Sequence, residues 1–158
     1  MIEYEPIGII ETPFEDQRNM PIQPVGADGI KGKVILDTKY VSGLKDLDGF
    51  SHIMLIYHFH QSEKTMLLAR PFLEEVERGI FATRGPSRPN KIGISVVSLT
   101  GIKDNELDVM NVDMLNRTPL LDIKPYVPAF NNASDISIGW LGKRIAEANK
   151  KRTDDRFL

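Results

Sequence analysis

The pattern of apolar and polar positions along the chain predicts mainly short β-strands. Residues 51–60 are apolar on both faces for most of their length, which is typical of a strand that is central or belongs to a closed barrel. Residues 92–103 and 106–112 flank Asp104 and Asn105, a turn pair that indicates a β-hairpin. Shorter strands are predicted over residues 4–10, 31–36 and 120–123, whereas residues 67–77 fit either a strand or a helix.

Helical signals are few. Residues 38–47 predict a short helix, and residues 14–29, with two prolines and two glycines, predict a loop. Ile138, Leu141, Ile145 and Ala148 recur at helical spacing, which predicts an amphipathic helix over residues 137–151. Strands and helices do not alternate, so a doubly wound sheet is excluded. We expect a mostly β protein, a small closed β-barrel of about six or seven strands with a C-terminal helix.

This pattern divides the chain into a β-barrel domain over residues 1–137 and a basic C-terminal helix and tail over residues 138–158. The 158 residues contain no cysteine, which excludes a disulfide framework, a thiolate nucleophile and a cysteine-held cluster. There is no glycine-rich dinucleotide fingerprint and no P-loop. The first residues lack the leader of a secreted protein and no apolar run reaches the length of a membrane span, so we expect a cytoplasmic protein without a membrane partner.

Charge is unevenly distributed although the net charge is only −2. Residues 81–95 carry Arg84, Arg88 and Lys91 and no acid, on a loop stiffened by two prolines. Fixed guanidinium groups suit recognition of carboxylate or phosphate, but the same arginines could equally pair with surface acids. Residues 139–158 hold six basic and three acidic side chains. Any contact with a nucleic acid would therefore come from these two segments.

The three histidines share one face of the strand predicted at residues 51–60. His52 and His58 are about 20 Å apart along a strand, too far to bind one metal ion, whereas His58 and His60 are about 6.6 Å apart. No acidic or cysteine side chain nearby offers an obvious third ligand, and we expect no metal site. Structural hydrogen bonding and a role at a ligand pocket remain open.

Asp122, Lys124 and Tyr126 alternate with apolar residues and would share one face of a strand. An acceptor, a cation and an aromatic ring side by side could form a site. The alternative is a surface ion pair between the first two residues, which would contribute little stability.

Three strings of residues together resemble one protein family. They are ATRGPSRPNKIGIS at residues 82–95, LDGFSH at residues 47–52 followed by FHQ at residues 59–61, and TPLLDIKPYVP at residues 118–128. Their sequence and order resemble the TsaA-like family of S-adenosyl-L-methionine-binding β-barrel proteins, over residues 7–128. Characterised members are tRNA adenine N(6)-methyltransferases that act on threonylcarbamoyladenosine next to the anticodon. The resemblance implies tRNA as partner and S-adenosyl-L-methionine as cofactor.

The resemblance also implies a homodimer that binds the methyl donor near the interface between its copies. The donor site that it implies is built from the loop before residue 31, the end of the long strand, the basic loop and the start of the last strand. Its residues are Pro21, Ile22, Gln23, His60, Gln61, Arg84, Ile94, Asn116, Arg117, Thr118 and Pro119.

The chemistry of methyl transfer assigns roles to the remaining motif residues. The exocyclic amine is a poor nucleophile because its lone pair is delocalised, so a group that accepts its proton would help. We expect Asp122 to be this acceptor, with Lys124 and Tyr126 completing the catalytic set and Tyr126 able to stack on a base. Basic-loop residues would bind the substrate through its phosphate or threonyl carboxylate: Arg88, Asn90 and Lys91.

The chain departs from the family pattern at three places. The family usually has Arg where this chain has Ile22, Asp-Gly where it has Asn116 and Arg117, and Pro where it has Lys91. Larger bacterial members also carry an added carboxy-terminal domain. These departures and the negative net charge favour, as an alternative, a non-catalytic S-adenosyl-L-methionine-binding or regulatory protein.

Overall fold

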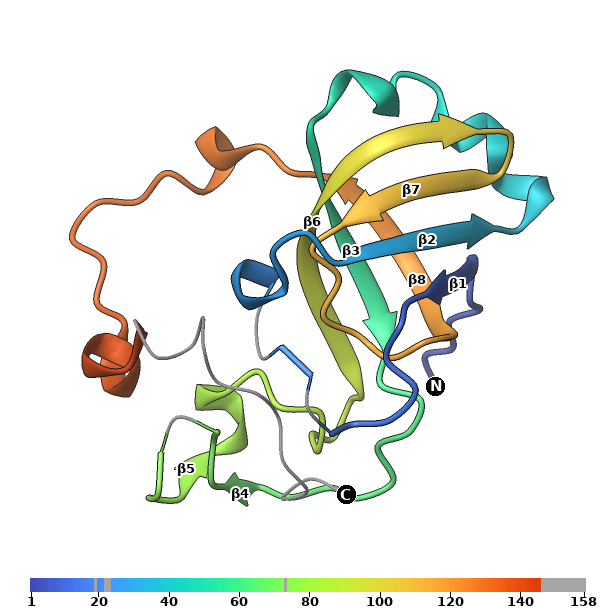
Figure 1. Ribbon diagram of the computed structural model, residues 1–158. Helices are drawn as coiled ribbons and strands as arrows, with labels where there is room; N and C mark the ends of the chain where they lie inside the picture. The colour runs from blue at the N-terminus through green and yellow to red at the C-terminus, as the bar shows by residue number, and fades with distance from the viewer. Residues whose placement is uncertain (19, 22–23, 73, 146–158) are drawn as a thin grey trace.

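The computed structural model describes residues 1–18, 20–21, 24–72 and 74–145, and its centre is a closed antiparallel barrel (Figure 1). The barrel strands are β1 (Gly8–Glu11), β2 (Lys31–Leu36), β3 (His52–His58), β6 (Ile92–Lys103), β7 (Glu106–Met110) and β8 (Thr118–Pro125). They pair around the barrel in the order β1-β2-β7-β6-β3-β8. The fold class predicted from the sequence, a mostly β protein with a closed barrel, is confirmed.

Side chains alternate between the inside and the outside of the barrel, as the pleat of a strand requires. On β3, Ile53, Leu55 and Tyr57 are buried, while the residues between them face outward and are half-buried. This explains why the strand is apolar on both faces. The core is completed by buried side chains from every other barrel strand: Ile10, Val34, Leu36, Val97, Leu107, Val109 and Leu120.

Gly93 permits a close approach inside this core. It lies opposite Tyr57 in the pairing of β3 with β6. A Cβ atom built on Gly93 would lie 2.7 Å from Cζ of Tyr57 and 2.8 Å from Cζ of Phe59, which is closer than real carbon atoms approach. The two rings, whose centroids are 5.5 Å apart, therefore occupy the space that any other residue at position 93 would need.

The helices differ from the sequence-based expectation. Residues predicted as one helix form two short 3₁₀ turns, η2 (Thr38–Leu44) and η3 (Leu47–Gly49). Other 3₁₀ turns are η1 (Pro24–Ala27), η4 (Ile80–Ala82) and η5 (Pro128–Asn131). The predicted C-terminal helix is represented by the 3₁₀ turn η6 (Gly139–Lys143), and its remainder from residue 146 lies outside the described residues. The division of the chain at residues 137 and 138 stays a prediction.

The ambiguous segment, residues 67–77, is neither a long strand nor a long helix where it is described. It contributes β4 (Leu68–Ala69), which pairs with β5 (Arg78–Gly79) to form a separate two-stranded sheet. This sheet belongs to the long connection between β3 and β6, residues 59–91, and lies beyond one end of the barrel (Figure 1).

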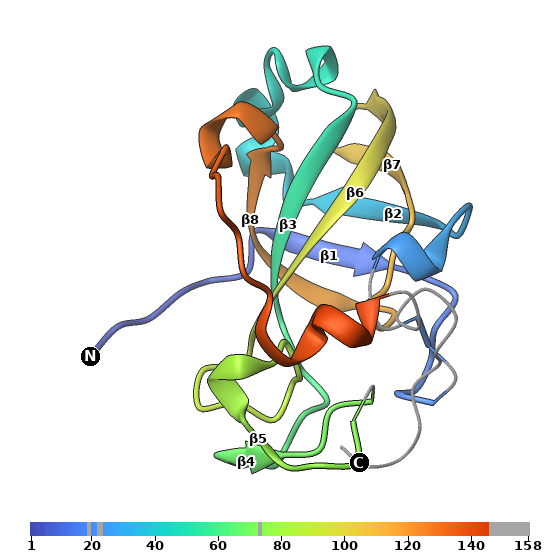
Figure 2. The ribbon, with the colours of Figure 1, turned by 90° about the vertical axis from the view of Figure 1, so that its left-hand side faces the viewer.

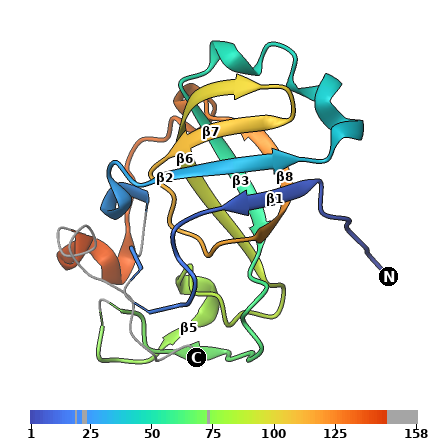
Figure 3. The same cartoon turned by 45° about the vertical axis from the view of Figure 1, so that its right-hand side comes forward.

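Three long connections leave the barrel at the same end. Here β1, β3 and β7 finish and β2, β6 and β8 begin, as the registers and Figure 3 show. This end is termed the loop end. At the opposite end β6 and β7 are joined by a tight turn at Asp104 and Asn105, as predicted.

The chain after β8 returns outside the barrel to the connection between β3 and β6 (Figure 2). Nε1 of Trp140 donates a hydrogen bond of 2.9 Å to the carbonyl oxygen of Ala82. Arg78 lies 5.8 Å from the Trp140 ring centroid, and both Arg78 and Arg144 pair with Glu74, at 3.2 and 3.7 Å. No helix in the described part of the chain is long and apolar enough to cross a membrane.

Candidate functional site

Four segments that carry candidate donor residues, far apart in the chain, come together at the loop end. Pro21 lies in the connection from β1 to β2, His60 and Gln61 follow β3, and Arg84 precedes β6. The fourth group, Asn116, Arg117, Thr118 and Pro119, leads into β8. Ile94 lies on the outer face of β6, near its start. Ile22 and Gln23 lie outside the described residues.

Asn116 fastens the turn before β8 to the end of β1. Its Oδ1 accepts a hydrogen bond of 3.0 Å from the Thr12 amide, and its Nδ2 donates one of 2.9 Å to Glu15. The next residue, Arg117, has a positive φ of 62°. This left-handed conformation favours glycine, which is what the family usually has at this position. Arg117 therefore adopts a backbone conformation that glycine would adopt without strain.

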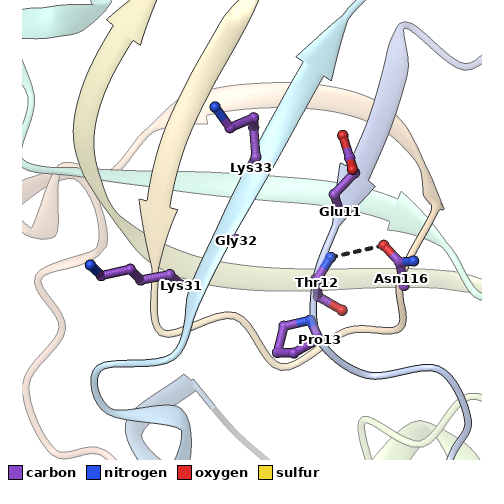
Figure 4. Close-up of a pocket in the computed structure, with 7 residues that line it drawn as sticks. All are labelled: Glu11, Thr12, Pro13, Lys31, Gly32, Lys33 and Asn116. Atoms are coloured by element: carbon purple, nitrogen blue, oxygen red, sulfur yellow. Dashed lines mark hydrogen bonds between the residues drawn. The ribbon is translucent and has the colours of Figure 1, made fainter.

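An open depression lies on the barrel wall beside this turn (Figure 4). Its volume is about 370 Å³. The lining combines acidic, basic and amide side chains from the ends of β1 and β2 and from the turn before β8: Glu11, Thr12, Pro13, Lys31, Gly32, Lys33 and Asn116. One candidate donor residue, Asn116, therefore lines this depression together with charged side chains.

His60 offers an unused polar atom at the loop end. Its Nδ1 is buried and has no hydrogen-bond partner among the described residues. Burial is the main cause that lowers the pKa of His60, and electrostatic interactions with His58 and Arg117 lower it further, against the opposing effect of a hydrogen bond with the backbone of His58. His60 therefore lies close enough to Arg117 for their charges to interact, which brings two of the candidate donor segments together.

Two hydrogen bonds, one buried and one partly buried, run in series from the core to the connection between β7 and β8. The hydroxyl groups of Tyr57 and Ser95 are 2.8 Å apart, and Oγ of Ser95 donates a bond of 2.6 Å to Oδ1 of Asp113. Burial raises the pKa of Asp113 to about 7, against the opposing effects of the hydrogen bond from Ser95 and the charge of Arg84. Burial likewise raises the pKa of Tyr57, so that its hydroxyl stays protonated.

This network was not predicted from the sequence. Its only local signal is that Asp113 stands between Val112 and Met114, both of which are buried. Ser95 ends one of the motif strings, but nothing in the sequence links it to Asp113, because the two residues meet only when β6 and the connection between β7 and β8 close the barrel.

Hydrogen bonds to backbone carbonyl oxygens stabilise the basic loop of residues 81–95. Nη1 of Arg88 donates to the carbonyl oxygens of Thr83 and Gly85, at 3.0 and 3.1 Å, and more weakly to that of Ile80. Nζ of Lys91 donates to Thr65 Oγ1 at 3.0 Å and to a neighbouring carbonyl oxygen. These contacts give both residues a structural role, and their binding of substrate, like that of the exposed Asn90, stays a prediction.

Asp122, Lys124 and Tyr126 lie outside the loops of the loop end. Asp122 is opposite Ile56 of β3, which is itself opposite Ile94 of β6, so Asp122 shares the outer face of the barrel with Ile94. Nζ of Lys124 lies 3.1 Å from Oδ2 of Asp122 on the outer face of β8, and both side chains are half-exposed. Asp122 is four residues beyond Thr118, or about 13 Å along the strand. Tyr126 contacts the ring of His52, with centroids 6.4 Å apart. The surface ion pair, one of the two interpretations of the sequence, is present, and the catalytic roles stay predictions.

His52 interacts with the residue that precedes it. Nδ1 of His52 lies 2.7 Å from Oγ of Ser51. Across the residues that the structure describes, no group of three or more His, Cys, Asp or Glu side chains could hold a metal ion.

Sequence comparisons connect this arrangement to known proteins. A family model described as the tRNA-methyltransferase O N-terminal domain matches residues 9–132. A probable S-adenosyl-L-methionine-binding protein of Pyrococcus abyssi is 50% identical over 158 residues, covering 100% of this chain and 86% of the relative. A tRNA (adenine(37)-N6)-methyltransferase of Mus musculus is 30% identical over 141 residues, covering 85% of this chain and 33% of the relative.

A comparison with solved structures points to the same family. The crystal structure of TrmO from Pseudomonas aeruginosa matches with a TM-score of 0.74 and 35% identity, over 89% of this chain. This chain spans 62% of that chain. The family resemblance inferred from the sequence motifs is confirmed by both comparisons. The chain belongs to the family of the tRNA-methyltransferase O N-terminal domain.

Proposed function

We propose that the protein is an S-adenosyl-L-methionine-dependent tRNA methyltransferase. Its substrate would be the exocyclic amine of threonylcarbamoyladenosine next to the anticodon. The observation that carries this proposal is the convergence of four chain segments with candidate donor residues at the loop end of a barrel from this family. The mouse relative is named for methylation of adenine 37 at N6, which supports a tRNA substrate for this chain.

The residues at the loop end fit the proposed methyl donor. Arg84 is exposed and makes no ion pair within the described ranges, so its guanidinium is available for the donor's carboxylate. The partnerless Nδ1 of His60 is available for a polar group of the donor. When bound, the donor supplies a methyl group already activated on a sulfonium. The protein has to orient the reactants and exclude water.

Donor binding and methyl transfer should both be measurable without added metal. We expect calorimetry to show one donor site per chain, and labelled donor to modify tRNA from cells that lack this methylation. EDTA should change neither result, since transfer from a sulfonium needs no metal. Failure of donor binding would contradict the whole proposal. Binding without transfer to any tRNA would instead support the non-catalytic, regulatory alternative.

Arg84 offers a matched test of the donor site. Arg84→Gln should weaken donor binding at least tenfold, because a charge-assisted contact to a carboxylate contributes about 1.5–3 kcal/mol. Arg70→Gln is the control, since Arg70 is an exposed arginine with a long ion pair of 3.8 Å to Glu75. Equal donor affinity in the two variants would remove Arg84 from the donor site.

We also propose that the protein is a cytoplasmic homodimer, and apolar side chains near the loop end support the dimer. Ile92 and Ile94 on the outer face of β6 are 43% and 42% exposed, next to the half-buried Ile56 of β3. Light scattering should give the mass of two chains. Ile92→Lys should give one chain, while Ile136→Lys, at an isoleucine with 69% exposure after β8, should leave the dimer intact. A monomeric wild-type protein would contradict the proposal.

A further inference from the structure

The connection between β7 and β8 places a carboxyl group inside the loop end. Val112 and Met114 of this connection are buried against the core, and Asp113 between them is partly buried. The amide groups of Asn111 and Val112 donate to the carbonyl oxygen of Ile30, which fixes the connection against the start of β2. The position of Asp113 is therefore set by packing on both sides.

Two hydroxyl groups in series orient this carboxyl group. The single proton of Ser95 Oγ is donated to Asp113, so the hydroxyl of Tyr57 must supply the proton in its own bond to Ser95. The relay stabilises the ionised form of Asp113, and so does a hydrogen bond with the backbone of Asp113 itself. Tyr57 is fixed by the ring of Phe59 and by the absence of a side chain at Gly93.

The charged groups around Asp113 also point to the reaction site. Arg84, from the connection before β6, is the cation whose charge acts on both Asp113 and Tyr57. Arg84 is also the exposed cation offered to the methyl donor. Asp113 is three residues before Asn116, and its partner Ser95 directly follows Ile94, so its carboxyl group lies near two candidate donor residues. Asp122 is on the outer face of β8 and is paired with Lys124.

We propose that Asp113 accepts the proton that the adenosine amine loses during methyl transfer, with Ser95 and Tyr57 as its positioning residues. The inference rests on the proposed function. The amine nitrogen forms a bond to the methyl carbon while the carbon–sulfur bond breaks and its electron pair stays on sulfur. The proton of the nitrogen passes to the Asp113 carboxylate, which becomes a neutral carboxylic acid. No oxidant, reductant or further reactant is required.

The acid–base properties of Asp113 suit this role. Burial in the loop end raises its pKa to about 7, so a substantial fraction is ionised at neutral pH and can still bind a proton. A proton acceptor works best when its pKa is near the working pH. Two titratable side chains interact electrostatically with Asp113. They are Tyr57 on β3 and Arg84 before β6.

Asp113→Asn separates proton acceptance from shape, since the amide oxygen can still accept from Ser95 but the group cannot bind a proton. We expect its single-turnover rate of methyl transfer to fall about 10²- to 10⁴-fold. Donor affinity by calorimetry and tRNA affinity should stay within about threefold of wild type, because the acceptor acts in the transition state. Asp104→Asn, in the exposed turn at the opposite end of the barrel, is the matched control and should change the rate less than about threefold.

Two further measurements test the relay itself. The carboxyl carbon resonance of Asp113 in the donor-free protein should titrate with a midpoint near pH 7. Ser95→Ala removes a donor to the carboxylate, so it should move both this midpoint and that of the pH–rate profile upward. If Asp113 has only a structural role, the resonance midpoint moves but the midpoint of the pH–rate profile does not.

The outcomes distinguish this inference from the proposed function. If wild type transfers methyl groups and Asp113→Asn does so at a similar rate, Asp113 is not the acceptor although the function stands. If Asp113→Asn loses donor binding, the residue belongs to the donor pocket and the inference is wrong. Should the resonance show that Asp113 is fully ionised at pH 5, the inference fails as well. If wild type binds donor but methylates no tRNA, the proposed function fails and the inference with it.

Discussion

Gly93→Ala will lower the free energy of unfolding by about 3 kcal/mol, since overpacking typically destabilises a core by about 1–3 kcal/mol and a buried hydrogen bond adds about 1. The new methyl group would collide with the rings of Tyr57 and Phe59. Tyr57 must then move, which breaks its bond to Ser95. For a chain of this size, we expect the melting temperature to fall by roughly 10 °C.

Gly101→Ala is the control for this prediction because Gly101 lies on the same strand, β6. The nearest atom to a Cβ built there is Oδ2 of Asp108, at an ordinary 3.6 Å. We expect a change within about 0.5 kcal/mol, as for other substitutions without a clash. Urea unfolding measures both variants. Equal destabilisation would show that the space beside Tyr57 is not what requires glycine at position 93.

Asp113 will make the stability of the protein fall as the pH rises from about 4 to about 7. Its pKa is about 7 in the folded protein, whereas a carboxyl group in an unfolded chain has a pKa of about 3.9. Between these values the folded state binds the additional proton, so the slope of unfolding free energy against pH is negative. The limiting slope is about 1.4 kcal/mol per pH unit, and we expect a total of about 2–4 kcal/mol.

His60 acts in the opposite direction, so the measurement must isolate Asp113. The folded pKa of His60 is lowered, and the unfolded state therefore takes up its proton first as the pH falls through about 6.5. Comparing wild type with Asp113→Asn by urea unfolding at pH 5, 6, 7 and 8 cancels this contribution. Asp122→Asn, at a half-exposed ion pair, should keep the wild-type slope. Parallel curves for wild type and Asp113→Asn would contradict the assignment.

The barrel could be predicted from the sequence because its strands carry local signals. The apolar run that contains Ile53 and Leu55, and the turn at Asp104 and Asn105, depend on neighbouring residues alone. The prediction of one continuous helix over residues 38–47 was wrong. Gly43 and the β-branched Val41 disfavour an α-helix, and the chain forms 3₁₀ turns instead. The shape of residues 67–77 depends on pairing with Arg78 and Gly79, which no local pattern shows.

The candidate site was only partly predictable, for a related reason. The motif residues could be named because they occur in recognisable strings, and barrel topology brings Arg84 and Arg117 to one end. The sequence favoured Asp122 as proton acceptor because it alternates with apolar residues inside such a string. The acid–base behaviour of Asp113 comes from burial and from Ser95, 18 residues away, and neither is visible before the barrel closes.

The contact between the returning chain and the basic loop gives the protein a built-in optical reporter. Trp140 is the one tryptophan in the sequence, and its indole donates to Ala82, two residues before Arg84. Tryptophan emission responds to the polarity and hydrogen bonding around the indole, so it reads out the state of the loop that carries Arg84. Any rearrangement of that loop on ligand binding can thus be followed in the unlabelled protein, at its natural sequence and in real time.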